Sequence, residues 1–404
     1  MLRKILLILL SVFLLEIHAQ ENIEEIPRYE ISMLTIGPGN SLSDAFGHSG
    51  IRVIDRVNNY DIVFNYGVYD YNAPNFYGNF VKGRPIYSLG KNRFENFYRS
   101  YVNSSRQIIE QKLNLSEYKK RVLVNKLITN SKEENKDYKY NYFENNCSTK
   151  IGDIFNVLLE EEIRNEGINL DNINSNSYRK LVYQHVVPNS WGALGIDICL
   201  GSVIDKNITD QDELFLPYNL KLYFDKLGNS NIRNGDLVET SILFGEYIEY
   251  EETSFSPLYV LLILSLIIII ITFLDYLKIT RNVALDIIIL LITGLIGLLL
   301  VYLWFFSNHI ASAWNYNLLW AFPFNLILLF QLLKKKQSRW VLSYLKINVL
   351  MLLLMCLHWI IGIQVFNICL ISLILALIVR YLYLIKYFSN RIRYLYENLY
   401  KIRR

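Results

Sequence analysis

The chain has 404 residues, of which 52% are hydrophobic, and it carries 41 basic and 37 acidic side chains. The net charge of +4 is too small to indicate nucleic-acid binding, and no basic patch with interleaved aromatic residues is present. Hydrophobic residues have an ordinary frequency up to Ser256 and are much denser after it, so the chain divides into at least two parts.

The first 19 residues have the pattern of a secretory signal peptide. Basic Arg3 and Lys4 precede a short apolar run from Ile5 to Leu15, and the small residue Ala19 offers a cleavage point. The run is short for a membrane span, although an uncleaved anchor is the alternative. Under both interpretations the following segment, residues 20–256, is exported.

The exported segment combines strand patterns with helical patterns. Alternating and β-branched runs predict strands at Arg28–Thr35, His48–Ile54, Tyr60–Tyr66, Pro85–Leu89 and Gln107–Leu113. Helical spacing of apolar residues predicts helices at Leu115–Ile128, with Ser116 as N-cap, and at Ser148–Glu161. The predicted fold class is therefore α+β, an antiparallel sheet with helices packed on it.

Residues 257–404 are predicted to form a transmembrane domain of five helices. The apolar segments are Leu258–Leu274, Val283–Phe306, Leu318–Leu333, Val341–Ile361 and Phe366–Val379. The last can extend beyond Arg380 if that side chain snorkels. Lys and Arg occur in alternate connections and in the tail, so the positive-inside rule places these regions in the cytoplasm. Five crossings that begin outside end with a cytoplasmic C-terminus, in agreement with the export signal.

The predicted outer loop from Ser307 to Asn317 lacks Lys and Arg but contains several amides and His309. Such groups at the water–lipid boundary can bind a lipid head group, whereas the alternative is an interfacial aromatic belt. Asn325 and His358 lie inside predicted spans, where polar side chains mark either function or interhelical hydrogen bonds.

Of the four cysteines, only Cys147 and Cys199 lie in the exported segment, so a disulfide framework is not expected, although a single bridge between them is the alternative. Cys147 directly precedes a predicted helix. The positive end of a helix dipole favours an anion there, and a lowered thiol pKa makes the thiolate nucleophile. A buried structural cysteine at a helix start is the competing interpretation.

His48 begins a predicted strand between Gly47 and Gly50, and a Cys–His pair makes a nucleophile and its base. A third group should orient the imidazole, and the next strand offers Asp61 and Asn65 on one face, of which Asn65 is preferred. The Cys147 N–H is expected to bind the oxyanion together with a second donor that the sequence does not identify. Exported His and Cys residues are too few and too badly spaced for a closed zinc site, so neither metal nor cofactor is expected.

Several motifs resemble the Lnb-type lipoprotein N-acyltransferases of Bacteroidota, and the order of His, orienting residue and Asn-Cys resembles circularly permuted papain-like enzymes. The resemblance lies in Phe46-Gly47-His48-Ser49-Gly50, Asn65-Tyr66-Gly67, Pro74-Asn75-Phe76, Tyr87-Ser88-Leu89, Asn145-Asn146-Cys147-Ser148-Thr149, His309 and Asn315-Tyr316-Asn317. It implies a permuted papain-like periplasmic domain anchored in the inner membrane by a multi-span tail. It also implies Cys147 as the acyl-bearing nucleophile and His48 as the base, while Asp61, Asn146, His309 and Asn315 are candidates for substrate contact.

The expected activity is transfer of an acyl chain from a membrane phospholipid, through a Cys147 thioester, to the free α-amino group of an S-diacylglyceryl-cysteine lipoprotein. One alternative is a membrane-anchored cysteine amidase or peptidase that acts on cell-wall peptides. Another is a non-enzymatic membrane assembly protein in which Cys147 and His48 only pack.

Overall fold

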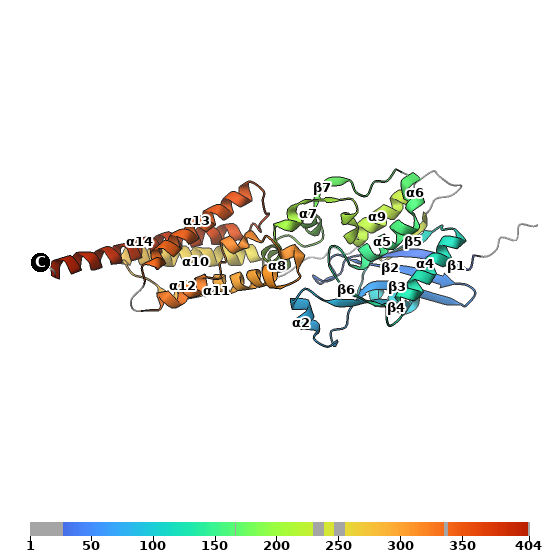
Figure 1. Ribbon diagram of the computed structural model, residues 1–404, viewed down its shortest axis with the longest axis horizontal. Coiled ribbons are helices and arrows are strands. Elements are labelled where there is room, and N and C mark those ends of the chain that lie inside the picture. Colours follow the sequence, from blue (N-terminus) through green and yellow to red (C-terminus); the bar gives the residue numbers. More distant parts are fainter. Residues whose placement is uncertain (1–26, 166, 229–237, 246–254, 335–337, 403–404) are drawn as a thin grey trace, which may run out of the picture.

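The computed structural model describes residues 27–165, 167–228, 238–245, 255–334 and 338–402. The predicted signal peptide, residues 1–19, lies outside the described residues. Figure 1 shows an elongated molecule in which an α+β body and a helical bundle lie end to end.

The body is built on a seven-stranded sheet in which each neighbouring pair is antiparallel, in the order β6-β4-β3-β2-β1-β5-β9. The five predicted strands are all present, although β4 continues to Arg93, and β6 and β9 were not predicted. Their bounds are β1 Tyr29–Ile36, β2 His48–Asp55, β3 Tyr60–Val68, β4 Ile86–Arg93, β5 Ile108–Leu113, β6 Asp137–Lys139 and β9 Val238–Phe244.

Helices cover both faces of the sheet because successive strand residues point to opposite sides. On β1, Ile31 and Met33 face a core shared with α4 (Glu117–Asn130), α5 (Cys147–Leu158) and α9 (Pro217–Gly228). The alternate residues of β1 pack instead against α3, which spans Phe94–Asn103. This arrangement confirms the predicted α+β class with an antiparallel sheet.

Both predicted helices of the body are present with small differences at their ends. Ser116 caps α4 by accepting a hydrogen bond from the Lys119 N–H, as expected. The second helix begins at Cys147 and ends at Leu158, and a separate helix, α6 (Glu160–Asn165), follows it. Cys147 is thus the first residue of α5, whereas the sequence placed it directly before the helix.

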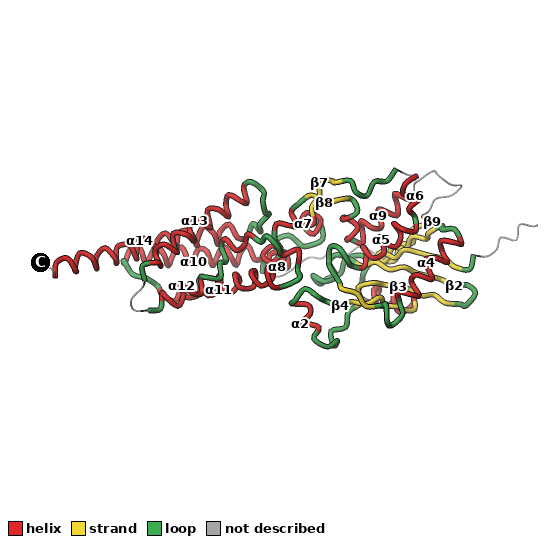
Figure 2. The backbone as a smooth tube through the Cα atoms, viewed as in Figure 1, coloured by secondary structure: helices red, strands yellow, loops and turns green. Residues whose placement is uncertain are grey.

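A small helical layer joins the body to the bundle. It contains α7 (Tyr178–Val182) and α8 (Trp191–Cys199), which lie at the junction in Figures 1 and 2. Nearby, β7 (Ile173–Ser177) and β8 (Asn207–Thr209) form a separate two-stranded sheet. The short helix α2 (Phe76–Val81) also lies at the end of the body that faces the bundle.

Four helices among the described residues are long and apolar enough to cross a membrane: Pro257–Lys278 (α10), Val283–Phe306 (α11 with a π-helical end), Trp340–Ile360 (α13) and Leu370–Arg391, within α14 (Leu370–Ile402). The predicted third span is not a continuous helix. A 3-10 turn, Tyr316–Leu319, is followed by an irregular stretch containing Pro323 and by the short α12, Asn325–Leu332. Proline lacks the N–H that would continue a helix through this stretch.

Polar side chains inside the bundle are paired with one another. Asn325 donates to Thr293 and accepts from Tyr344 and Asn348, so its role is interhelical hydrogen bonding, the second of the two interpretations above. The last span does extend beyond Arg380, to Arg391, but not through snorkelling. The Arg380 side chain is fully buried and pairs with Asp275 and Asp286, both at 2.8 Å. Pairing with two carboxylates offsets the cost of burying its charge.

Candidate active site

Cys147 lies at the N-terminus of α5, and its neighbour Asn146 fixes that terminus. The Asn146 Oδ1 accepts hydrogen bonds from the N–H groups of Ser148 and Thr149 at 2.8 and 2.9 Å. Its Nδ2 donates to the carbonyls of Tyr142 and Phe215, both at 2.8 Å. The amide therefore uses its full hydrogen-bonding capacity within the fold, so it serves as a helix cap and has no group left for substrate.

The structure brings His48 and Cys147 together although 98 residues separate them in sequence. A hydrogen bond of 2.9 Å between the buried hydroxyls of Ser49 and Ser148 joins the start of β2 to the start of α5. Gly67, in β3, lies beside both residues. If it carried a Cβ atom, that atom would be 3.6 Å from the Cys147 Cβ and 3.8 Å from the His48 Cε1. The Cys147 side chain and the His48 imidazole thus line one small space.

The surroundings of Cys147 favour its thiolate. Burial raises the pKa of the thiol, but the charge of His48 and its hydrogen bond to the sulfur lower it, with smaller contributions from the Ser49 backbone and Ser148. The net direction is downward, as expected for a nucleophilic cysteine beside a histidine. All four cysteines are free, so the alternative Cys147–Cys199 bridge does not form.

Gly67 shapes the space between the two reactive side chains. Gly67 has a φ of +90°, which residues with a side chain rarely adopt. The pairing of β3 with β4 is also irregular between Asn65 and Val68. A bulge of this kind bends the strand and re-aims its residues. The bend brings Gly67 close to both the Cys147 side chain and the His48 ring, and its lack of a side chain leaves the site open.

Two tyrosines complete the surroundings of the pair. The Tyr101 ring from α3 stacks on His48 with a centroid distance of 6.3 Å, which restricts the orientation of the imidazole. The Tyr138 hydroxyl, from β6, is buried 4.0 Å from the Cβ position on Gly67 and makes no well-formed hydrogen bond within the described residues, apart from a weak contact with the Gly67 backbone. Burial, followed by the charge of Cys147, raises the pKa of Tyr138, so the phenol keeps a proton to donate.

The two candidates for the orienting group lie in different surroundings. Asp61 forms a two-point ion pair with Arg52 at 2.6 and 2.8 Å, and it precedes Gly67 by six residues on β3, roughly 20 Å along the strand. The structure therefore does not bring Asp61 to His48. Asn65 is buried on β3, and its Oδ1 has no hydrogen-bond partner within the described residues.

The outer-loop candidates contact the body of the protein. The His309 Nε2 lies 3.0 Å from the Phe80 carbonyl oxygen of α2, and the fully buried Asn315 donates to the Ile198 carbonyl of α8 at 2.8 Å. Asn317, two residues on, donates to the Asp197 carbonyl at 2.8 Å. These amides hold the exported body on the bundle, and their hydrogen bonds within the protein leave little capacity for a lipid head group.

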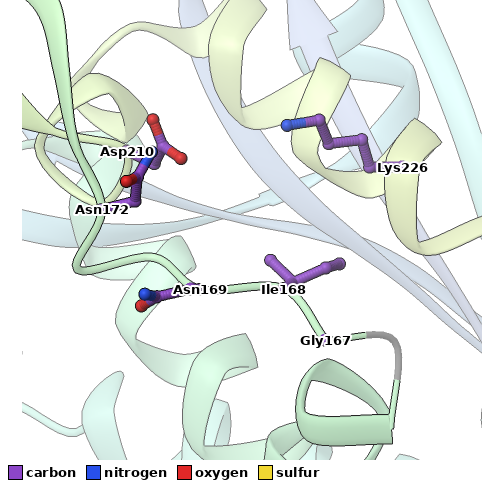
Figure 3. A pocket seen from close by; sticks show the side chains of 6 residues that line it. All are labelled: Gly167, Ile168, Asn169, Asn172, Asp210 and Lys226. Carbon is purple, nitrogen blue, oxygen red and sulfur yellow. The ribbon is translucent and has the colours of Figure 1, made fainter.

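The hollow shown in Figure 3 is not part of this site. Its lining comes from the loop after α6, from α9 and from Asp210: Gly167, Ile168, Asn169, Asn172, Asp210 and Lys226. The hollow lies beyond the C-terminal end of α5, whereas Cys147 lies at its N-terminal end. The two ends of a helix of this length are roughly 18 Å apart.

Sequence reasoning missed two residues of the site. Gly67 belongs to the Asn65-Tyr66-Gly67 motif, so its proximity to Asn65 could have drawn attention to it. Tyr138 gave no signal because it is one of 30 tyrosines, in a strand of three residues that no pattern predicts.

Comparisons with known proteins identify the family. A model of the Lnb N-terminal periplasmic domain matches residues 20–184, and a model of the Lnb transmembrane domain matches residues 249–391. No curated protein and no solved structure matches the chain at a significant level. The two matched regions hold the Cys–His pair and the membrane helices respectively, and the chain belongs to the Lnb family.

Proposed function

We propose that the protein is a lipoprotein N-acyltransferase with Cys147 as its acyl-carrying nucleophile. The observation that carries the proposal is the placement of Cys147 and His48 around Gly67, in a domain whose α2 and α8 contact the outer loop of a membrane bundle. A nucleophile fixed beside a bilayer suits substrates that are themselves anchored in lipid, because both are then presented at high effective concentration.

In the first half-reaction the Cys147 thiolate attacks an ester carbonyl of a phospholipid. The tetrahedral intermediate collapses when His48, in its imidazolium form, donates a proton to the departing glycerol oxygen. The products are an acyl thioester on Cys147, a lysophospholipid and a neutral His48.

In the second half-reaction the α-amino group of an S-diacylglyceryl-cysteine lipoprotein attacks the thioester carbonyl. Neutral His48 takes a proton from the attacking nitrogen, and the Cys147 thiolate leaves. The result is a stable amide on the lipoprotein, and the thiolate–imidazolium pair is restored.

Two donors serve the oxyanion in this proposal. The first is the Cys147 N–H, since Asn146 caps the N–H groups of Ser148 and Thr149 and not that of Cys147 itself. The second is the Tyr138 hydroxyl, which is buried beside Gly67 with its hydrogen-bonding capacity unused. Asn65 remains the candidate for orienting His48, since its buried Oδ1 has no hydrogen-bond partner among the described residues.

The proposed topology places the body in the periplasm and the C-terminus in the cytoplasm. The interrupted segment from Tyr316 to Leu332 supplies the fifth crossing: Asn317, near its start, bonds to the exported body, and the Leu332 carbonyl at its end lies 3.5 Å from Arg281 in the opposite loop. The order of His48, Asn65 and Cys147 on strand, strand and helix agrees with a circularly permuted papain-like domain.

The test is mass spectrometry of lipoprotein N-termini in cells that depend on this protein for N-acylation. Cys147→Ser and His48→Asn should each abolish the N-linked acyl chain while membrane insertion persists. Purified protein should also form a hydroxylamine-sensitive acyl adduct with phospholipid vesicles. Full N-acylation by the Cys147 variant would falsify the thioester route, and cleavage of cell-wall peptides without any phospholipid adduct would support the amidase alternative.

A further inference from the structure

An aromatic surface surrounds α2 on the exported body. Its members, which we call the aromatic platform, are Tyr69, Tyr71, Phe76, Tyr77 and Phe80. Tyr77 is 69% exposed, Tyr71 57% and Phe80 50%, and α2 buries none of its residues. A cluster of large exposed rings on one short helix marks an interaction surface, because burying them elsewhere would be favourable.

The bundle determines where this surface lies relative to the bilayer. The Asn308 N–H donates to the Lys82 carbonyl at 2.9 Å, and the Cβ position on Gly83 lies only 2.7 Å from the Asn308 backbone, so the two backbones touch. Phe305 and Phe306, the last residues of the helix that precedes Asn308, are 62% and 72% exposed. The exposed aromatic residues therefore continue from the end of a membrane helix onto α2.

The charges beside the platform agree with a location at a lipid surface. Lys82 and Arg84 follow α2 directly and are exposed. Aromatic rings with nearby cations are typical of the membrane interface, where rings lie at the level of the head groups and cations meet phosphates.

A row of rings connects the platform with the nucleophile. Tyr69 lies 5.1 Å from Tyr87 between ring centroids, and Tyr87 stacks on Tyr140 at 4.2 Å. Tyr140 directly precedes Asn141, whose backbone pairs with that of Asn145, two residues before Cys147, so the end of the row lies next to the start of α5. The row thus begins at the exposed platform and ends in the site.

We propose that the aromatic platform lies in the outer leaflet of the bilayer and that the row Tyr69–Tyr87–Tyr140 leads a phospholipid acyl ester from the leaflet to Cys147. The inference rests on the proposed acyl transfer and adds the route by which the donor enters. The occupant of the platform is phospholipid, because the platform continues the exposed aromatic surface of a membrane helix.

The location of the platform is tested without catalysis. The photoreactive residue p-benzoylphenylalanine replaces Tyr77 in the full chain carrying Cys147→Ala, reconstituted in vesicles of phosphatidylethanolamine and phosphatidylglycerol. The matched control places it at Tyr118, which is 76% exposed on α4 at the distant side of the body. We expect a phospholipid adduct at position 77 at least tenfold above that at position 118, and equal yields would overturn the proposal.

The route is tested by activity. Tyr77→Asp with Phe80→Asp should slow thioester formation from vesicle phospholipid at least tenfold, whereas Tyr118→Asp should not. Alkylation of Cys147 by iodoacetamide should be unchanged in both, which shows that the fold and the thiol are intact. Wild-type rates of thioester formation in the double variant would overturn the route, whereas absence of the thioester in the wild-type protein would instead contradict the proposed function.

Discussion

Ser49 and Ser148 share a buried hydrogen bond of 2.9 Å, and they directly follow His48 and Cys147 in the sequence. Both side chains are fully buried. The bond therefore connects β2 with α5 at the point where His48 and Cys147 meet, and it fixes the distance between base and nucleophile through two short side chains.

We expect Ser148→Ala to lower both stability and rate. The change leaves the Ser49 hydroxyl without its partner in a buried position, at a cost of about 1–3 kcal/mol. Without the bond, β2 and α5 can shift relative to each other. This shift should reduce the rate of acyl transfer by about tenfold, because small displacements of reacting groups slow a reaction. Thermal unfolding and thioester formation measure the two effects, with exposed Ser131→Ala as control.

The double variant Ser49→Ala/Ser148→Ala isolates the bond itself. Removing both hydroxyls leaves no unpaired donor, so part of the lost stability should return. Strictly additive losses in the double variant would show that the two serines act independently.

The pH dependence of Cys147 alkylation should move upward when His48 is replaced. In the wild-type protein the downward pKa shift keeps the thiolate populated as pH falls below about 8.5, the ordinary thiol value. In His48→Asn the two largest lowering interactions are removed while burial still raises the pKa, so the midpoint should lie above that of the wild-type protein. The rates of alkylation by iodoacetamide between pH 5 and 10 give both midpoints. An unchanged profile in the variant would show that His48 does not lower the pKa of the thiol.

Much of the fold follows from the sequence because it depends on local patterns. The strand from His48 alternates between two faces, Ser116 caps its helix, and Cys147 opens the next one, all within windows of a few residues. The pairing of His48 with Cys147 was also predictable, since the exported part contains few residues capable of this chemistry.

The remaining features depend on contacts between distant segments. The third span has the composition of a helix but is interrupted around Pro323, and the turn before the break is bonded to α8 through Asn317. Arg380 finds partners 94 and 105 residues away, which no local pattern reveals. For the same reason the sequence did not show that Asn315 and Asn146 bind the protein's own backbone, or that Asp61 is paired with Arg52.

Tyr138→Phe should reduce the rate of acyl transfer with little change in substrate affinity. Its hydroxyl is the proposed second oxyanion donor, and loss of one such donor typically costs about 100-fold or more in kcat. Tyr66→Phe is a suitable control, because that hydroxyl bonds to Asn130 on α4 and not to the reacting groups. A rise in KM with an unchanged kcat would assign Tyr138 to binding and remove it from the oxyanion site.

The junction between body and bundle should be sensitive to Asp197. This buried carboxylate on α8 accepts from Arg179 and Tyr183 through Oδ1, both at 2.7 Å, and from Asn367 in the bundle at 2.8 Å through Oδ2. Asp197→Ala leaves Arg179 with Asp205 as its remaining carboxylate partner and removes the acceptor of Asn367. Breaking a buried ion pair in this way typically costs about 3–5 kcal/mol.

The expected result is a body that keeps its active site but loses its position on the bundle. Cys147 should still be alkylated with the wild-type pH profile, since the Asp197 carboxylate takes no part in the Ser49–Ser148 bond or the α5 cap. Acyl transfer from vesicle phospholipid should fall at least tenfold. Glu160→Gln is the matched control: its ion pair with Arg164 is exposed and worth at most about 0.5 kcal/mol, so neither readout should change. If both readouts fell together in Asp197→Ala, the variant would have lost the fold of the body, and docking on the bundle would not explain the loss of activity.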